Sequence, residues 1–267
     1  ASAVDLGLYA DFEKNGENAI HIHSEGYSDF TVRLNHTAVR TGEFGTPKSL
    51  VRGMVAAFRE LGLNCGGFNA EIRTTLPAGS GLSSSAAYTV LIGKILSELF
   101  NDGKVDPVVI ARAAQQSENK YFGKPCGLMD QLACSLGHTV YVDFHTNEIE
   151  PIQADFRSMG LTLCLTDTGG SHAGLDTSYA RIPADMVYIA NLFDKGVLGD
   201  VDPEEFRRKG WDPANRPVRR AMHFFNENER VPLMRDALKR GDTFYVTVSL
   251  DNNPGICLLY TSPSPRD

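Results

Sequence analysis

Short stretches in which apolar and polar residues alternate open the chain. Turn-forming Asn, Gly and Ser residues separate these stretches, as they commonly separate the strands of a sheet. The alternation predicts strands at residues 4–9, 19–23, 30–34 and 68–76. A similar pattern predicts a later strand at about residues 139–144.

Apolar residues recur at helical spacing between and after these strands. A helix that begins at Thr46-Pro47 and ends at Gly62 has a stripe of Leu50, Met54, Phe58 and Leu61. A second helix, over residues 84–100, has a stripe that should face a sheet, formed by Ala87, Leu91, Ile95 and Leu99. A third begins at Asp106-Pro107 and ends at Gly123, and a short apolar helix follows the turn at 124–130.

The pattern changes near Pro151. A new strand is predicted at residues 161–166, and helical patterns dominate from Ser178 onward. We therefore predict an α+β fold with two domains, at residues 1–155 and 156–256. Residues 257–267 form a polar, Pro-broken string that is either a native disordered tail or a non-native appended sequence, and we favour the second.

Composition limits the classes of function. The 267 residues are 42% hydrophobic and 22% charged, which is typical of a globular protein. A net charge of −7 argues against nucleic-acid binding, which needs a basic face. No apolar run approaches the ~20 residues of a membrane span, so we expect no membrane partner.

Cysteine and histidine usage suggests the compartment and argues against a metal cluster. The five cysteines show neither Cys-x-x-Cys pairing nor histidines at zinc spacing, so we expect free thiols and a cytoplasmic protein. His21 and His23 alternate on a predicted strand and can in principle share a metal ion. Because no third ligand follows at motif spacing, a solvated strand face is the favoured interpretation.

The most informative stretch lies between the fourth strand and the second helix. Residues 76–87 read Leu-Pro-Ala-Gly-Ser-Gly-Leu-Ser-Ser-Ser-Ala-Ala. A Gly- and Ser-rich turn before a helix N-terminus offers unpaired N–H groups and a positive dipole end to a phosphate. It lacks the Gly-Lys-Ser/Thr ending of a Walker loop. The alternative is an ordinary Ser-capped helix after a Gly-rich turn.

Two carboxylates downstream suggest chemistry. Glu118 lies near the end of the third helix, and Asp130 follows in a Pro/Gly-bounded turn. A rigidly held carboxylate can accept a proton or orient a hydroxyl. A second carboxylate can complete a Mg²⁺ shell with phosphate oxygens and a serine. Taken singly, an ordinary turn residue is the favoured interpretation of Asp130, and a solvated helix residue that of Glu118.

Together these motifs resemble the galactokinase branch of the GHMP small-molecule kinases. Residues 76–87 are similar to that superfamily's signature Pro-x-x-x-Gly-Leu-x-Ser-Ser-x-Ala. Residues 118–131 resemble the galactokinase segment Glu…Gly-x-Pro-Cys-Gly-Ile-Met-Asp-Gln, with Leu128 in place of Ile. Residues 48–62 and 167–179 also read like galactokinase, and the resemblance extends to about residue 245.

The resemblance implies a reaction and a site. It implies ATP-dependent phosphorylation of the C1 hydroxyl of galactose, by a monomer that uses ATP and Mg²⁺. The ATP phosphates would lie on Gly79, Ser80, Gly81, Leu82, Ser83, Ser84 and Ser85, with Ser84 and Glu118 on Mg²⁺. Asp130 would be the catalytic residue beside the sugar C1 hydroxyl, and Gly127 and Tyr179 would contact the sugar. It also implies a ribosomal-protein-like first domain and an incomplete ferredoxin-like second domain.

Departures from the family pattern lower the expected activity. No match is present to the family's early Gly-Arg-x-x-x-x-Gly-Glu-His-x-Asp-Tyr motif or to its late Gly-Ala-Gly-x-Gly-Gly motif. Residues 244–249 alternate like a strand where the family has a helix. We expect a chain truncated at both ends, with weak or no turnover and a tendency to aggregate.

Three other functions remain open. Another GHMP kinase, for mevalonate, homoserine or N-acetylgalactosamine, shares the phosphate loop, although the Cys-Gly-Leu-Met-Asp-Gln run disfavours the first two. A non-catalytic galactokinase-like sensor would bind sugar and ATP without needing Asp130. A plain α+β binding domain with a chance Gly/Ser turn would require two separate coincidences.

Overall fold

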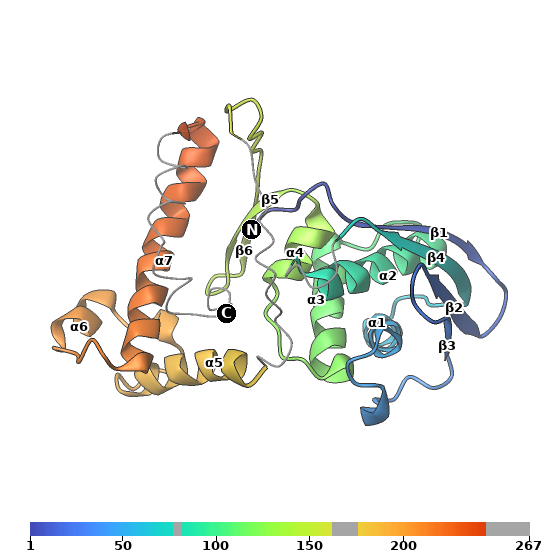
Figure 1. The fold of residues 1–267 in the computed structure, drawn as a ribbon, viewed down its shortest axis with the longest axis horizontal. Coiled ribbons are helices and arrows are strands. Elements are labelled where there is room, and N and C mark those ends of the chain that lie inside the picture. Colours follow the sequence, from blue (N-terminus) through green and yellow to red (C-terminus); the bar gives the residue numbers. More distant parts are fainter. Residues whose placement is uncertain (77–81, 162–175, 244–267) are drawn as a thin grey trace. The chain divides into compact units, whose positions relative to one another are not determined.

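The structure is a computed structural model that describes residues 1–76, 82–161 and 176–243, with backbone only for 176–180 (Figure 1). The chain divides into two compact units, Ala1–Val140 and Tyr141–Asp267. This division precedes the boundary predicted near residue 155. The α+β class is confirmed, because helices and sheets occur side by side along the chain.

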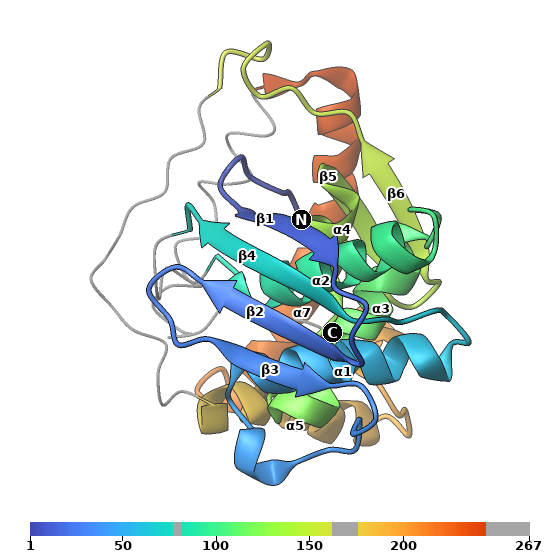
Figure 2. The same ribbon diagram turned by 90° about the vertical axis from the view of Figure 1, so that its right-hand side faces the viewer.

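A four-stranded sheet forms one layer of the first unit (Figure 2). Its strands are β1 (Leu8–Lys14), β2 (Ala19–Ser24), β3 (Phe30–Arg33) and β4 (Phe68–Thr74), in the order β1-β4-β2-β3. β4 runs antiparallel to β1 and parallel to β2, and β3 is antiparallel to β2. Because successive side chains of a strand point to opposite faces, the alternating apolar residues of these strands lie on one face of the sheet, and the core lies on that face.

The first strand lies later in the sequence than predicted. The prediction placed it at residues 4–9, whereas β1 pairs with β4 from Leu8↔Thr74 to Lys14↔Phe68. The residues before it form no strand, and an isolated bridge joins Ser2 to Thr139. The long pairing with β4 sets the register, because the backbone polar groups of β1 that face β4 gain hydrogen-bond partners.

Two helices, α1 (Pro47–Glu60) and α2 (Ser84–Phe100), cover one face of the sheet, and α3 (Pro107–Ser117) packs against both of them. The predicted starts are confirmed by their caps. The Thr46 side chain accepts a hydrogen bond from the Ser49 N–H, and the Asp106 side chain accepts one from the Val108 N–H. α1 ends before Gly62, whose φ of +73° suits a left-handed terminus.

α2 is buried on more sides than its predicted stripe. Ala87, Leu91 and Leu99 of that stripe are only partly buried, whereas Ile92, Ile95 and Leu96 are fully enclosed. The reason is its position, since α2 contacts β1 and also α1, α3 and α4 (Met129–Leu136). A helix in contact with other elements on several sides needs apolar residues beyond one stripe.

The predicted third helix changes geometry before its end. The α-helical pattern stops at Ser117, and a π-helical turn, Glu118–Phe122, continues to Gly123. The Glu118 carbonyl accepts the Gly123 N–H at 3.1 Å, which is the five-residue spacing of a π-turn. Gly123 then has a φ of +80° and ends the segment, as predicted.

The second unit combines a hairpin with helices. β5 (Thr139–Asp143), which begins just before the unit boundary, pairs with β6 (Glu148–Ile152), and α5 (Asp176–Asn191), α6 (Pro203–Arg208) and α7 (Arg216–Arg240) follow. A helical core forms around Phe206, and Trp211 packs against it with ring centroids 5.1 Å apart. The strand predicted at 161–166 lies almost wholly outside the described residues, as do residues 244–267. The ferredoxin-like arrangement stays a prediction. None of the described helices is long and apolar enough to cross a membrane.

Candidate active site

Glu118 is a carboxylate almost completely enclosed within the first unit. Its exposed fraction is only 2%, and it begins the π-helical turn at the end of α3. π-turns inside helices are frequent at functional sites. The π-helical turn therefore begins at Glu118, the residue that the sequence analysis selected as a candidate metal ligand.

Two side chains from different helices hold this carboxylate. Ser85 Oγ, in the first turn of α2, donates to Glu118 Oε2 at 3.0 Å. Gln131 Nε2, in α4, donates to Glu118 Oε1 at 2.8 Å. Three segments that are distant in sequence therefore converge on one acid. The sequence analysis missed the role of Gln131, although it quoted this residue within the Met-Asp-Gln run.

Burial raises the pKa of Glu118 above its usual value of 4.5, because desolvation penalises the charged form. The hydrogen bonds from Gln131 and Ser85 and the charge of Lys124 act in the opposite direction, while the charge of Asp130 adds to the increase. A nearby cation would reduce this penalty. The raised pKa therefore indicates a site suited to positive charge.

The serine run before α2 is described only in part. Gly79, Ser80 and Gly81 lie outside the described residues, whereas Leu82, Ser83, Ser84 and Ser85 lie within them. Ser83 has a left-handed conformation with φ 53°, and its side chain does not cap the helix. Non-glycine residues rarely adopt this conformation, and such residues cluster at ligand-binding sites.

The structure pairs Glu118 with Ser85, and Ser84 is exposed beside it. The sequence could not distinguish these adjacent serines, since the choice depends on how α2 is rotated against α3. The assignment of Ser84 to the metal stays a prediction. Ser85 is the serine with an observed link to the acid.

The turn that contains Gly127 is fixed to the end of α3. The Cys126 N–H donates to Asn119 Oδ1 at 2.7 Å, and Asn119 Nδ2 donates back to the Cys126 carbonyl at 3.4 Å. Gln115 Nε2 donates to the same carbonyl at 3.3 Å. These contacts hold the turn between Glu118 and α4. Neither amide residue was predicted from the sequence.

Cys126 is a partly buried thiol at this turn. Its Sγ lies 3.4 Å from Gln131 Nε2, and burial raises its pKa to about 12. Cys65 and Cys134 have pKa values raised by burial to about 11. All three described cysteines are free, as predicted, while Cys164 and Cys257 lie outside the described residues.

Asp130 lies in the first turn of α4, next to Gln131. It is half-buried, and its charge contributes to the raised pKa of Glu118. The structure therefore places both predicted carboxylates in one neighbourhood. The side chain of Tyr179, in the second unit, lies outside the described residues.

The donor set fits a magnesium ion that is shared with phosphates. Mg²⁺ prefers hard oxygen ligands and usually takes one or two carboxylates together with phosphate oxygens and water. Glu118 and the serine hydroxyls supply such oxygens. Among the described residues there is no group of three His, Cys, Asp or Glu side chains that could hold a metal ion by itself.

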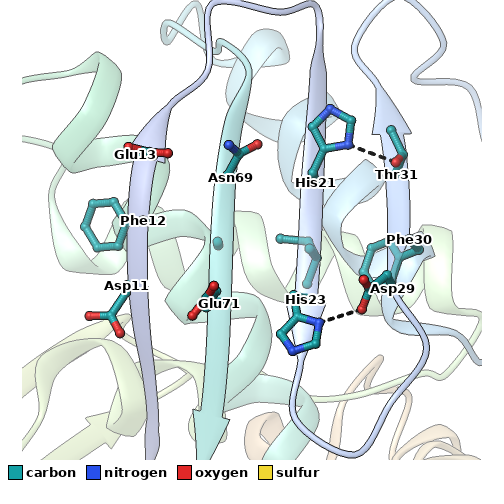
Figure 3. Close-up of a pocket in the computed structure, with 12 residues that line it drawn as sticks. Asp11, Phe12, Glu13, His21, His23, Asp29, Phe30, Thr31, Asn69 and Glu71 are labelled. Atoms are coloured by element: carbon teal, nitrogen blue, oxygen red, sulfur yellow. Dashed lines mark hydrogen bonds and ion pairs between the residues drawn. The ribbon is translucent and has the colours of Figure 1, made fainter.

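A separate hollow lies on the open face of the sheet (Figure 3). It measures about 740 Å³ and is lined by residues of all four strands, most of them polar, together with Asp29. His21 Nδ1 lies 3.0 Å from Thr31 Oγ1, and His23 Nδ1 lies 2.6 Å from Asp29 Oδ1. The hydrogen bond with Asp29 raises the pKa of His23. The histidines belong to a polar strand face, as predicted.

Comparison with known proteins points to one group of kinases. Residues 49–138, which contain most of α1, all of β4, and Glu118 with its partners Ser85 and Gln131, match the model of the GHMP kinases N terminal domain. The galactokinase of Lactobacillus helveticus is 29% identical over 90% of this chain and 64% of its own length. That of Clostridium tetani is 31% identical over 86% of this chain and 60% of its own length.

The structural comparison agrees with the sequence comparison. The crystal structure of Lactococcus lactis galactokinase complexed with galactose aligns with a TM-score of 0.75 at 22% identity, covering 94% of this chain and 69% of that one. The chain is similar to these galactokinases along most of its length and has the GHMP kinase fold. It spans 60–64% of the length of the two curated galactokinases named above. The resemblance predicted from the two motifs is confirmed.

Proposed function

We propose that this protein takes part in transfer of the terminal phosphoryl group of ATP to the C1 hydroxyl of galactose. The single observation that carries the proposal is the buried Glu118 carboxylate, held by Ser85 of α2 and Gln131 of α4. This arrangement fits phosphoryl transfer, which requires mainly alignment and charge neutralisation.

Each residue has a physical task in this proposal. The backbone N–H groups of Gly79 to Ser85 hold the ATP phosphates at the start of α2. Glu118 and Ser84 hold Mg²⁺, which when bound would neutralise the phosphate charge. Ser85 and Gln131 fix the orientation of Glu118.

The sugar lies beside Asp130 in this proposal. Asp130 orients the C1 hydroxyl or accepts its proton, and Gly127 and Tyr179 contact the ring. The Asn119 and Gln115 amides act indirectly, because they hold the turn that precedes α4. Because the 267 residues contain no match to the family's Arg-bearing early motif, we predict weak or no turnover by this chain alone.

A binding experiment tests the substrate class without requiring turnover. Saturation-transfer NMR would compare galactose, N-acetylgalactosamine, mevalonate and homoserine in the presence of Mg²⁺ and a non-hydrolysable ATP analogue. We expect the galactose signal to be strongest and Asp130→Asn to weaken it. Preferential binding of mevalonate or homoserine, or no sugar binding at all, would contradict the proposal.

A further inference from the structure

A second cavity, of about 470 Å³, lies beside the edge strand β3. Its lining comes from the starts of β2 and α1, the end of β3 and the loop between β3 and α1. Four of the residues that line it have basic side chains: Arg33, Arg40, Lys48 and Arg52. The chain as a whole has a net charge of −7, so this concentration of positive charge is unusual within it.

The carboxylates near this cavity already have partners. Arg52 is 2% exposed and binds Glu43 through two contacts, Nε–Oε2 at 2.8 Å and Nη2–Oε1 at 2.9 Å. Arg40 Nη1 lies 3.6 Å from the same carboxylate. Glu17, which also lines the cavity, lies 3.0 Å from His21 Nε2. Glu43 therefore interacts with both Arg52 and Arg40, and Glu17 interacts with His21.

Two cations remain without a direct partner. Arg33, which is exposed, and the half-buried Lys48 form no hydrogen bond or ion pair with any of the residues that the structure describes, although the charge of Lys48 acts on Glu43. Four cations line one cavity, and Glu43 is the carboxylate that three of them share, so the cations repel one another. A bound anion would reduce this repulsion. Arginine also offers a planar fork that suits phosphate oxygens.

This cavity differs from the predicted phosphate loop. β4 leads to that loop beyond Thr74, and Ser24 pairs with Ile72 near that end of the sheet. The cavity lies at the other end of β2, where Ala19 pairs with Arg33. Ala19 is small, so the space next to Arg33 stays open. We propose that the cavity beside β3 is a second anion site, which binds a small molecule through its phosphate group.

The volume and the charge define the ligand class. About 470 Å³ falls within the range of small-molecule pockets and exceeds what a bare phosphate needs. Several cations favour a dianion over a monoanion. The ligand is therefore a phosphate monoester, and its phosphate lies near Lys48 and Arg33.

Calorimetric titration of the whole chain with inorganic phosphate and with a hexose 1-phosphate tests this site. Lys48→Gln and Arg33→Gln remove cations that form no ion pair with the described residues, so neither change breaks a contact that the structure shows. We expect each variant to lose about tenfold in affinity, with binding weaker at higher salt. Lys104→Gln, at an exposed side chain away from the cavity, is the matched control and should bind normally.

Two further ligands separate the possibilities. Free hexose should not bind, and hexose 1-phosphate should bind at least as tightly as inorganic phosphate. Absence of phosphate binding, or equal affinity in the wild-type, Lys48→Gln and Arg33→Gln proteins, would overturn the proposal. Ser85→Ala should leave this site unchanged, so the result is independent of the proposed kinase function.

Discussion

At the residue scale, the account centres on a carboxylate that the protein buries at a cost. Glu118 receives hydrogen bonds from Ser85 and Gln131, yet burial still raises its pKa. Burial of the ionised carboxylate lowers the stability of the protein, but it leaves a negative charge that a bound cation can neutralise. Such burial is typical of functional rather than stabilising residues. Stability and metal binding should therefore respond in opposite directions when this acid is replaced.

Replacement of Glu118 by Gln should stabilise the protein at neutral and higher pH. A carboxyl whose pKa is raised by folding contributes stability below its unfolded value of 4.5, and loses it as pH rises through the folded value. Glutamine does not ionise and avoids this loss. Urea unfolding at about pH 5 and about pH 8 measures the difference, which should grow with pH. A wild-type protein that equals Glu118→Gln in stability at both pH values would contradict the account.

Arg52 is the residue whose loss should destabilise the first unit most clearly. It is 2% exposed, binds Glu43 twice and donates to the His36 carbonyl, so it fixes the loop between β3 and α1. Removal of one partner of a buried ion pair costs roughly 3–5 kcal/mol. Arg52→Met should lower the free energy of unfolding by about that amount.

The matched control for Arg52→Met is an exposed pair. Arg73 binds Asp11 on the open face of the sheet, with side chains 61% and 72% exposed. Surface ion pairs contribute about 0–1 kcal/mol, so Arg73→Met should change stability little. Equal effects of the two substitutions in denaturant titrations would show that Arg52 has no special structural role.

At the element scale, close contact between α1 and α3 positions the Glu118 turn. Gly53 of α1 lies directly against Ser117, and Ser117 Oγ donates to the Leu50 carbonyl at 2.8 Å. A Cβ at Gly53 would collide with the Ser117 side chain and with its Cα. This packing fixes the end of α3 immediately before Glu118.

Gly53→Ala should separate these two helices. Overpacking of this kind costs about 1–3 kcal/mol, so the melting temperature should fall. Gly42→Ala is the control, because a Cβ there would have no neighbour within 4 Å. Thermal unfolding of both variants checks the prediction. A Gly53→Ala protein as stable as Gly42→Ala would show that the helices can relax apart at no cost.

The amide contacts at the turn before α4 make a second prediction at this scale. Asn119 pairs with both the N–H and the carbonyl of Cys126. Asn119→Ala should free the turn and expose the thiol, whose pKa of about 12 keeps it protonated and slow to react. The rate of Cys126 modification by a disulfide reagent should rise in Asn119→Ala. An unchanged rate would mean that Gln115 alone holds the turn.

At the scale of the whole molecule, periodicity predicted much of the fold. The bounds of α2 and the starts of α1 and α3 follow from caps and apolar spacing, which are local signals. The predicted bounds of β1 were wrong at both ends, because its register depends on β4, which is distant in the sequence. The burial of α2 on several sides also depends on elements that no local pattern reveals.

The candidate site also combines residues that the sequence could suggest with contacts that only the fold reveals. Glu118, Asp130 and the serine run were suggested by the sequence, and the family resemblance that they carry is confirmed. The partners of Glu118 could not be predicted, because the rotation of α2 selects Ser85, and the π-turn sets where Glu118 meets Gln131. The roles of Asn119 and Gln115 could not be predicted, because their side-chain amides bind the backbone of Cys126 and no sequence motif indicates such contacts.

The central claim is that Glu118 and the start of α2 form a magnesium and nucleotide site. Its most direct test is calorimetric titration of the 267-residue chain with a non-hydrolysable ATP analogue, with and without Mg²⁺. The account predicts Mg²⁺-dependent binding to the wild type and to Lys104→Gln, and loss of that dependence in Glu118→Gln. Equal binding with and without Mg²⁺, or an unchanged Mg²⁺ effect in Glu118→Gln, would contradict it.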